Sequence, residues 1–262
     1  MGVYIAFAEK KFKSSSAYRF NNFAGILFSL INIFIYLSIS KMMYGGNTEY
    51  DGITIAMVST NLVITLVVGN CFHFDEFFIQ TKMMDGSIGN EFLRPVNFGL
   101  RILAENVGEA AYKLIYEGVP SLLISAILFH YQLPKSFLSF VLFLISITLG
   151  YLVLWSISFL TQILGFYIIN VWSVVTIKNV VINILAGVYI PIWFFPNYLK
   201  KFVEYTPFSS IYYIPVQIYL GTIDSTQILF AFLKQVIWLV SLLALCSLLF
   251  HKGKKKMIVQ GG

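Results

Sequence analysis

The chain is poor in charged residues. Lys, Arg, Asp and Glu make up only 11% of its 262 residues, whereas 58% are hydrophobic and the mean hydropathy is +0.79. Soluble domains carry about 25% charged residues, because a polar exterior must separate their core from water. The deficit excludes an ordinary water-soluble protein and leaves lipid as the solvent for most of the surface. No stretch is long and polar enough for a second folded domain, so residues 1–262 are predicted to form a single membrane domain.

Motifs of catalysis and metal binding are also missing. There is no Gly-x-x-x-x-Gly-Lys-Ser/Thr loop, so the chain is not expected to hydrolyse ATP itself. Neither His-Glu-x-x-His nor Gly-x-Ser-x-Gly occurs. Cys71 and Cys246 are far apart and lie in or near apolar runs, which favours two buried free thiols over a disulfide. We expect no catalytic residue, no metal and no cofactor in this chain, and the scattered basic residues form no nucleic-acid patch.

Long apolar runs, by contrast, are abundant. Six of them reach the roughly 20 residues that a helix needs to cross the hydrocarbon core of a membrane. They are apolar nearly all round, whereas a membrane barrel would show alternating segments of about 10 residues. The predicted fold is therefore all-α, a polytopic membrane protein with six transmembrane helices. The runs cover about 20–40, 53–73, 106–129, 136–161, 171–194 and 226–250.

Lys and Arg are unevenly distributed over the predicted loops. Cytoplasmic loops of membrane proteins are enriched in these residues, and an even number of spans brings both termini to the same side. With both termini in the cytoplasm, the inner set is Lys10, Lys11, Lys13, Arg19, Lys82, Arg94, Arg101, Lys113, Lys252, Lys254, Lys255 and Lys256. The outer set is only Lys41, Lys135, Lys200 and Lys201. We therefore predict a multi-pass protein with cytoplasmic termini.

The segment 1–19 mixes basic residues with Phe7, Phe12 and Tyr18. This pattern favours an interfacial helix that lies on the inner leaflet, where aromatic rings and cations both find partners. A loose tail before the first span is the alternative.

The longest inner loop, 75–105, contains a short amphipathic stretch. Asp85-Gly86 is a turn signal, Ile88 and Phe92 share one helix face, and Pro95 ends the helix. A helix of this kind suits docking to a soluble partner, or else it is a surface helix that rests on lipid headgroups. The residues assigned to docking are Gly86, Ile88, Phe92, Leu93, Arg94 and Pro95.

The stretch 187–221, predicted on the outer side, holds four prolines and many aromatic residues but few charges. It is typical of broken helices that dip into the outer leaflet, where non-helical backbone must be covered by protein or line a cavity. We interpret it as an outer gate; the alternative is a packed outer cap with no part in transport. The gate residues are Pro191, Phe194, Phe195, Pro196, Pro207, Phe208, Tyr213, Pro215, Tyr219 and Gly221.

Charged residues also fall inside predicted spans, and Glu117 and Lys178 are the two whose roles the pattern leaves open. Glu105, Glu109, Lys113 and Glu117 recur every four residues on one helix face, and Glu117 lies deepest. A charge at that depth is costly unless it is paired, so Glu117 is a functional or structural site by default. Lys178 is a possible partner for it, although that side chain can instead snorkel to the inner surface.

Three motifs in these segments resemble one known family, the six-span permease subunits of bacterial ATP-binding-cassette exporters of the second type, in the subgroup of antibiotic-export systems. The resemblance covers most of the chain. The motifs are Gly86-x-Ile88 leading to Leu93-Arg94-Pro95, Gly187 through Pro191 to Phe194-Phe195-Pro196, and Pro207-Phe208 through Tyr213-x-Pro215 to Tyr219-x-Gly221. Glu117 and Lys178 match no motif of the family.

The resemblance implies partners and a mechanism. Two permease chains, identical or related, would form the pore in the bacterial cytoplasmic membrane, each in contact with a cytoplasmic ATPase subunit that binds ATP and Mg. Residues 85–95 would form the coupling helix, residues 187–221 the outer re-entrant helices, and the loop 165–171 a second ATPase contact. The exported substrate would be amphipathic or hydrophobic: a peptide antibiotic, a drug, a lipid or a glycolipid.

Two other functions remain open at this point. An ion-coupled carrier would use Glu117 and would work without an ATPase. A non-transporting immunity or scaffold protein would bind a toxin tightly without ATP-stimulated flux.

Overall fold

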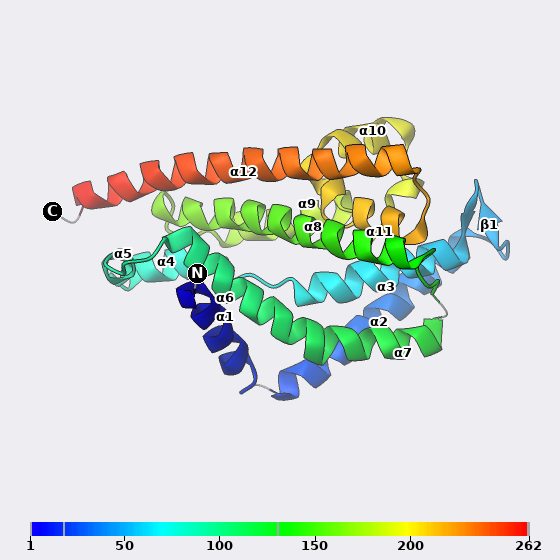
Figure 1. The fold of residues 1–262 in the computed structure, drawn as a ribbon, viewed down its shortest axis with the longest axis horizontal. Coiled ribbons are helices and arrows are strands. Elements are labelled where there is room, and N and C mark those ends of the chain that lie inside the picture. Colours follow the sequence, from blue (N-terminus) through cyan, green and yellow to red (C-terminus); the bar gives the residue numbers. More distant parts are fainter. Residues whose placement is uncertain (1, 18, 130, 261–262) are drawn as a thin grey trace.

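The computed structural model describes residues 2–17, 19–129 and 131–260. Nearly all of the regular structure is helical, and a two-stranded hairpin, β1 (Glu49–Tyr50) and β2 (Ile53–Thr54), closes one end (Figure 1). The first half of the chain forms α1 (Gly2–Ser15), α2 (Arg19–Met43), α3 (Ile55–Cys71), α4 (Phe78–Met84), α5 (Ile88–Phe92), α6 (Phe98–Lys113), the π-helical segment η1 (Leu114–Gly118) and α7 (Val119–Phe129). The second half forms α8 (Phe137–Ile163), η2 (Leu164–Phe166), α9 (Trp172–Leu185), η3 (Ile192–Phe194), α10 (Asn197–Tyr205), η4 (Pro207–Ser210), α11 (Tyr213–Leu220) and α12 (Ser225–Gln260).

Within the described residues, four helices are long and apolar enough to cross a membrane: Asn21–Met43, Phe98–Phe129, Phe137–Phe166 and Thr226–Lys255. The helical membrane class is thereby confirmed. The other two predicted spans correspond to the shorter apolar helices Ile55–Cys71 and Trp172–Leu185, so the count of six stays a prediction. Many large apolar side chains point outward, as on Phe23, Phe34 and Ile127, which suits a surface solvated by lipid.

Side-chain caps explain where three of the helices begin. Thr54 accepts a hydrogen bond from Met57 N at the start of α3, Asn97 from Leu100 N at the start of α6, and Ser136 from Ser139 N at the start of α8. Each side chain satisfies a backbone N–H that has no partner within the helix. The cap at Asn97 also corrects the predicted third span, which begins at Phe98 rather than near residue 106.

Helix α8 lies at the centre of the main core and packs against α11 and α12. The approach to α11 is close, because a Cβ at Gly150 would overlap the carbonyl oxygen of Ile211. Gln235 of α12 is fully buried there. Its amide nitrogen donates to Ser146 O at 3.1 Å and to Ser210 O at 2.8 Å, and its oxygen accepts from Ser146 Oγ at 3.0 Å. This one amide joins α12, α8 and η4.

Helix α1 packs along α6 through one face (Figure 1). Its partly buried positions follow helical spacing, and they include Phe12, whose ring meets Tyr112 edge-on at 5.4 Å. Lys11 pairs with Glu109 at 3.0 Å. Of the segment 1–19, residues 2–15 form the expected helix and attach to α6, 16–17 form a turn, and Arg19 already begins α2. Residues 1 and 18 lie outside the described residues, and the position of the helix on a leaflet stays a prediction.

Replacement of Gln235 by Leu should lower the free energy of unfolding by about 2–3 kcal/mol, because it leaves a serine hydroxyl and two carbonyls buried without their partner. Thermal unfolding of the purified chain in detergent measures this as a lower melting temperature. Gln227, exposed in the first turn of α12, is the matched control, and Gln227→Leu should change stability little. Equal effects of the two substitutions would show that the buried amide is not a stabilising junction.

Candidate functional site

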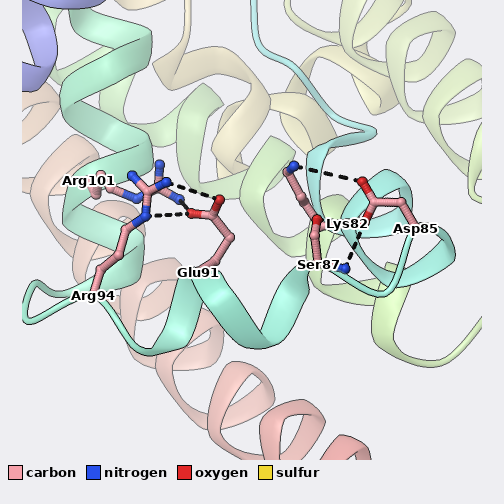
Figure 2. A network of polar contacts seen from close by, with 6 residues as sticks. All are labelled: Lys82, Asp85, Ser87, Glu91, Arg94 and Arg101. Carbon is pink, nitrogen blue, oxygen red and sulfur yellow. Dashed lines mark hydrogen bonds and ion pairs between the residues drawn. The ribbon is translucent and has the colours of Figure 1, made fainter.

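The turn between α4 and α5 is built around one carboxylate. Asp85 Oδ1 accepts hydrogen bonds from Ser87 N at 2.8 Å and from Ser87 Oγ at 2.6 Å, and Lys82 lies 3.7 Å from Oδ2 (Figure 2). These hydrogen bonds from Ser87, and then the charge of Lys82, lower the pKa of Asp85 below its ordinary value. Gly86 adopts a positive φ of 72°, which a side chain would disfavour. The predicted turn is therefore present, and it directs the chain into α5.

A buried ion pair attaches α5 to α6. Glu91, 8% exposed, accepts a hydrogen bond from Arg101, 3% exposed, at 2.7 Å. Figure 2 shows the Glu91 carboxylate facing the guanidinium groups of both Arg101 and Arg94, the latter at 3.4 Å, and Arg101 also pairs with Glu105 at 2.8 Å. The guanidinium of Arg101 further lies within 5.4–5.9 Å of the ring centroids of three phenylalanines, one of them Phe7 of α1. Arg101 thus joins α1, α4, α5 and α6.

The sequence alone does not predict the Glu91–Arg101 pair. Glu91 and Arg101 are ten positions apart and lie on different helices, so no helical spacing relates them. The one available signal was Arg101 itself, a charge in the apolar first turns of a long helix.

The surface of α5 differs from the predicted docking face. Ile88 is only 5% exposed and belongs to the main core, and Phe92 packs against Phe98 at 5.2 Å between ring centroids. Leu93, by contrast, is 82% exposed, and Arg94 and Pro95 follow it on the surface. The apolar residues that the helix pattern assigned to a partner therefore hold α5 in place, because the rest of this chain covers them. The docking role of the segment stays a prediction.

The loop 165–171 lies beside this segment. Val171 N donates to Gln80 Oε1 of α4 at 3.1 Å, and a Cβ at Gly165 would crowd the backbone of Gln80. Helices α4 and α5 and the connection from α8 to α9 thus form one surface at one end of the molecule, the end at which α12 also finishes (Figure 1).

The possible contact between Glu117 and Lys178 is not formed among the described residues. Lys178 of α9 pairs with Glu76, in the connection between α3 and α4, and donates to Ser158 Oγ of α8 at 3.1 Å. Sequence spacing could not reveal Glu76 as the partner, because it lies in an irregular segment that only the tertiary fold brings to α9. Glu117 instead lies in the π-helical segment η1, with its carboxylate against Gly25 of α2. Such segments interrupt α-helices frequently at functional sites.

A polar cavity of about 340 Å³ opens between α2, α3, α8 and α9. Glu76 and Lys178 line it together with His73 and several asparagines. A second cavity of about 730 Å³ contains Glu117, Lys113 and the Lys11–Glu109 pair. His73 and Asn70 line both cavities, so polar groups continue from one to the other.

The segment 187–221 is folded as the short helices η3, α10, η4 and α11, in agreement with the expected broken helices. Phe195 and Tyr213 meet in one small core with Ile192 and Val203. Phe194 instead contacts Tyr44, and Tyr219 donates from its hydroxyl to Gln132 O at 3.2 Å. Of the other predicted gate residues, Pro191 and Pro215 are buried, Pro207, Phe208 and Gly221 are half-buried, and Pro196 is exposed. Depth in a membrane and a gating role stay predictions.

The apolar helices of membrane-crossing length define a multi-pass membrane protein. A family model described as ABC-2 family transporter protein matches residues 20–261, and the chain belongs to this family. Its members are membrane components of transporters that work with an ATPase partner. Among curated proteins, none matches the chain.

Replacement of Glu91 by Gln should lower stability by about 2–3 kcal/mol, because Arg101 would lose its buried carboxylate and keep only the more exposed Glu105. Unfolding followed by circular dichroism measures the loss. Glu105→Gln is the control and should cost about 1 kcal/mol or less, since the Glu105 side chain is 27% exposed and Arg101 would keep Glu91.

The double variant Glu91→Leu with Arg101→Met removes both charges and should recover most of that stability, because two apolar side chains need no partner. A double variant as unstable as Glu91→Gln would contradict this account of the pair.

Proposed function

We propose that this chain is the permease subunit of an ATP-binding-cassette exporter of the bacterial cytoplasmic membrane. It crosses the membrane six times with both termini in the cytoplasm, and it moves an amphipathic or hydrophobic substrate outward. Candidate substrates are a peptide antibiotic, a drug, a lipid or a glycolipid. A separate ATPase subunit binds ATP and Mg and drives the change between inward- and outward-facing states, and coupling requires that the substrate bind these two states with different affinity.

The observation that carries this proposal is the family match over residues 20–261, together with the segment α4–α5. A segment that receives force from a partner must expose a surface and must also be rigidly attached to the helices that move. Leu93, Arg94 and Pro95 supply the exposed surface, and the buried Glu91–Arg101 pair supplies the attachment to α6. In the proposal, motion of the ATPase reaches α6, η1 and α7 through this pair.

The proposal assigns the outer gate to 187–221 and the pore to two permease chains. Support for a second chain comes from α2 and α9, which both line the 340 Å³ cavity and both carry large exposed side chains, among them Phe28 and Ile177. A half-open polar cavity beside apolar surfaces is what a second, identical or related, chain would complete. Support for the gate comes from the small core around Phe195 and Tyr213, in which Val203 of α10 packs, because this core is distinct from the main core around α8.

Substitution of Leu93 by Asp should weaken co-purification with the ATPase by about tenfold or more, because a carboxylate would replace the most exposed apolar residue of the segment at a desolvated contact. Pull-down of the tagged ATPase from membranes, quantified against the permease, measures it.

Leu133→Asp is the matched control, since Leu133 is 80% exposed and lies in the connection from α7 to α8, at the other end of the molecule. Both variants should reach the membrane in normal amounts. Equal recovery of the ATPase with Leu93→Asp and Leu133→Asp would show that the α4–α5 segment does not contact the ATPase.

Single cysteines at Asn47 and Lys255 test the orientation, since Cys71 and Cys246 are buried and should label poorly. A membrane-impermeant maleimide should label position 47 in intact cells and position 255 only after permeabilisation, because the proposal puts the basic C-terminal part of α12 in the cytoplasm. Labelling of both positions from the same side would contradict the proposed map of spans.

A further inference from the structure

Several hydrogen-bond acceptors in the lining of the 340 Å³ cavity receive no donor from the described residues. Asn70 Nδ2 donates to Ser29 Oγ at 2.8 Å, Asn183 Nδ2 to the hydroxyl of Tyr189 at 3.0 Å, and Asn32 Nδ2 to Phe28 O at 2.8 Å. Each of these asparagines therefore uses its amide nitrogen within the protein. No hydrogen bond from the described residues reaches the three side-chain oxygens, so the oxygens are available to a molecule in the cavity.

Glu76 adds an acceptor of a stronger kind. One of its carboxylate oxygens pairs with Lys178, but the other, Oε2, is buried and has no hydrogen-bond partner among the described residues. A buried carboxylate oxygen without a donor is costly, more so than a neutral group. Oε2 itself has almost no exposed area, but the Glu76 side chain lines the cavity, so a rotation of its carboxylate would bring this oxygen to a donor there.

The charges that face the cavity limit what that donor can be. Lys178 already neutralises Glu76, and the other titratable groups of the lining are His73, Tyr189 and Tyr212. A charged ligand would bring into the cavity a charge that has no counter-charge, because Glu76 and Lys178 already compensate each other. An uncharged N–H donor would not. Apolar side chains, such as Phe72, Leu154 and Ile182, complete the wall. The cavity volume is within the range of small-molecule sites, about 300–1,000 Å³.

We propose that this cavity binds the polar part of the exported substrate, and that this part is an uncharged amide-bearing group, as in a peptide bond, whose N–H donates to Glu76 Oε2. The asparagine oxygens accept from neighbouring N–H groups, and the apolar wall holds the adjoining side chains. The inference rests on the proposed export function, and it narrows the substrate class from amphipathic compounds in general to neutral, peptide-like ones.

The test compares two probes that differ only in donors. The purified permease–ATPase complex is placed in phosphatidylcholine–phosphatidylglycerol nanodiscs, and binding of a dansyl-labelled Phe-Leu-Phe tripeptide amide is followed by fluorescence. The second probe is the matching depsipeptide, in which ester oxygens replace the backbone N–H groups. The amide probe should bind about tenfold or more tightly than the ester probe, because each lost donor leaves a buried acceptor unpaired.

Variants of the cavity lining test whether these residues cause the preference for the amide probe. Glu76→Met with Lys178→Met removes the pair without leaving one charge alone, and it should reduce the amide-over-ester ratio to about twofold or less. Asn32→Leu breaks no contact between helices, because its amide nitrogen bonds within α2, and should weaken the amide probe about threefold or more. Asn47→Leu, the same change in the exposed loop before β1, should leave binding unchanged.

Equal affinity of the two probes for the natural chain would overturn the inference, as would a ratio unaltered in both the double variant and Asn32→Leu. If the double variant fails to fold, Asn32→Leu against Asn47→Leu still decides. ATP hydrolysis and ATP-driven transport by the complex are measured in the same nanodiscs or in liposomes. ATP-driven transport without a preference for the amide probe would contradict the inference but leave the export function standing. A preference for the amide probe without any association with the ATPase would contradict the export function but leave the binding preference standing.

Discussion

The buried Glu91–Arg101 pair is the interaction on which the rest of this architecture depends. A short helix such as α5 has too few internal hydrogen bonds to hold its own position. The ion pair fixes it to α6, and Arg101 extends the same attachment to α1 and α4 through Phe7 and Phe78. Because both charges are desolvated, neither can separate from the other without a large cost. Displacement of α5 should therefore move α6 with it.

The helix that receives this displacement is not uniform. From Phe98 it continues through the π-helical segment η1 into α7, and the extra residue per turn in η1 turns Glu117 toward α2 and Gly25. The charged cavity around Glu117 borders the cavity around Glu76 through Asn70 and His73. The attachment point, the irregular helix turn and the proposed substrate site thus follow one another along connected elements.

Glu76 and Lys178 connect the same regions by a second route. Glu76 lies just before α4, and Lys178 lies on α9, so the pair links the start of the α4–α5 segment to a helix that lines the 340 Å³ cavity. In the proposed exporter, the ATPase would act on the cavity from two sides, through α6 by Arg101 and through α9 by Lys178. A hydrogen bond from the substrate to Glu76 Oε2 would alter the strength of the Glu76–Lys178 ion pair.

The sequence by itself determined the membrane class, the helical fold, the turn at Asp85-Gly86, the broken helices of 187–221 and the family, because apolar length, proline placement and short motifs act locally along the chain. The tertiary structure alone decided which side chains meet. It turned Ile88 inward and Leu93 outward, and it paired Lys178 with Glu76 and Arg101 with Glu91. These pairs join segments that no helical period relates, so they form only when packing of α8 with its neighbours and of α1 with α6 has brought distant parts of the chain together.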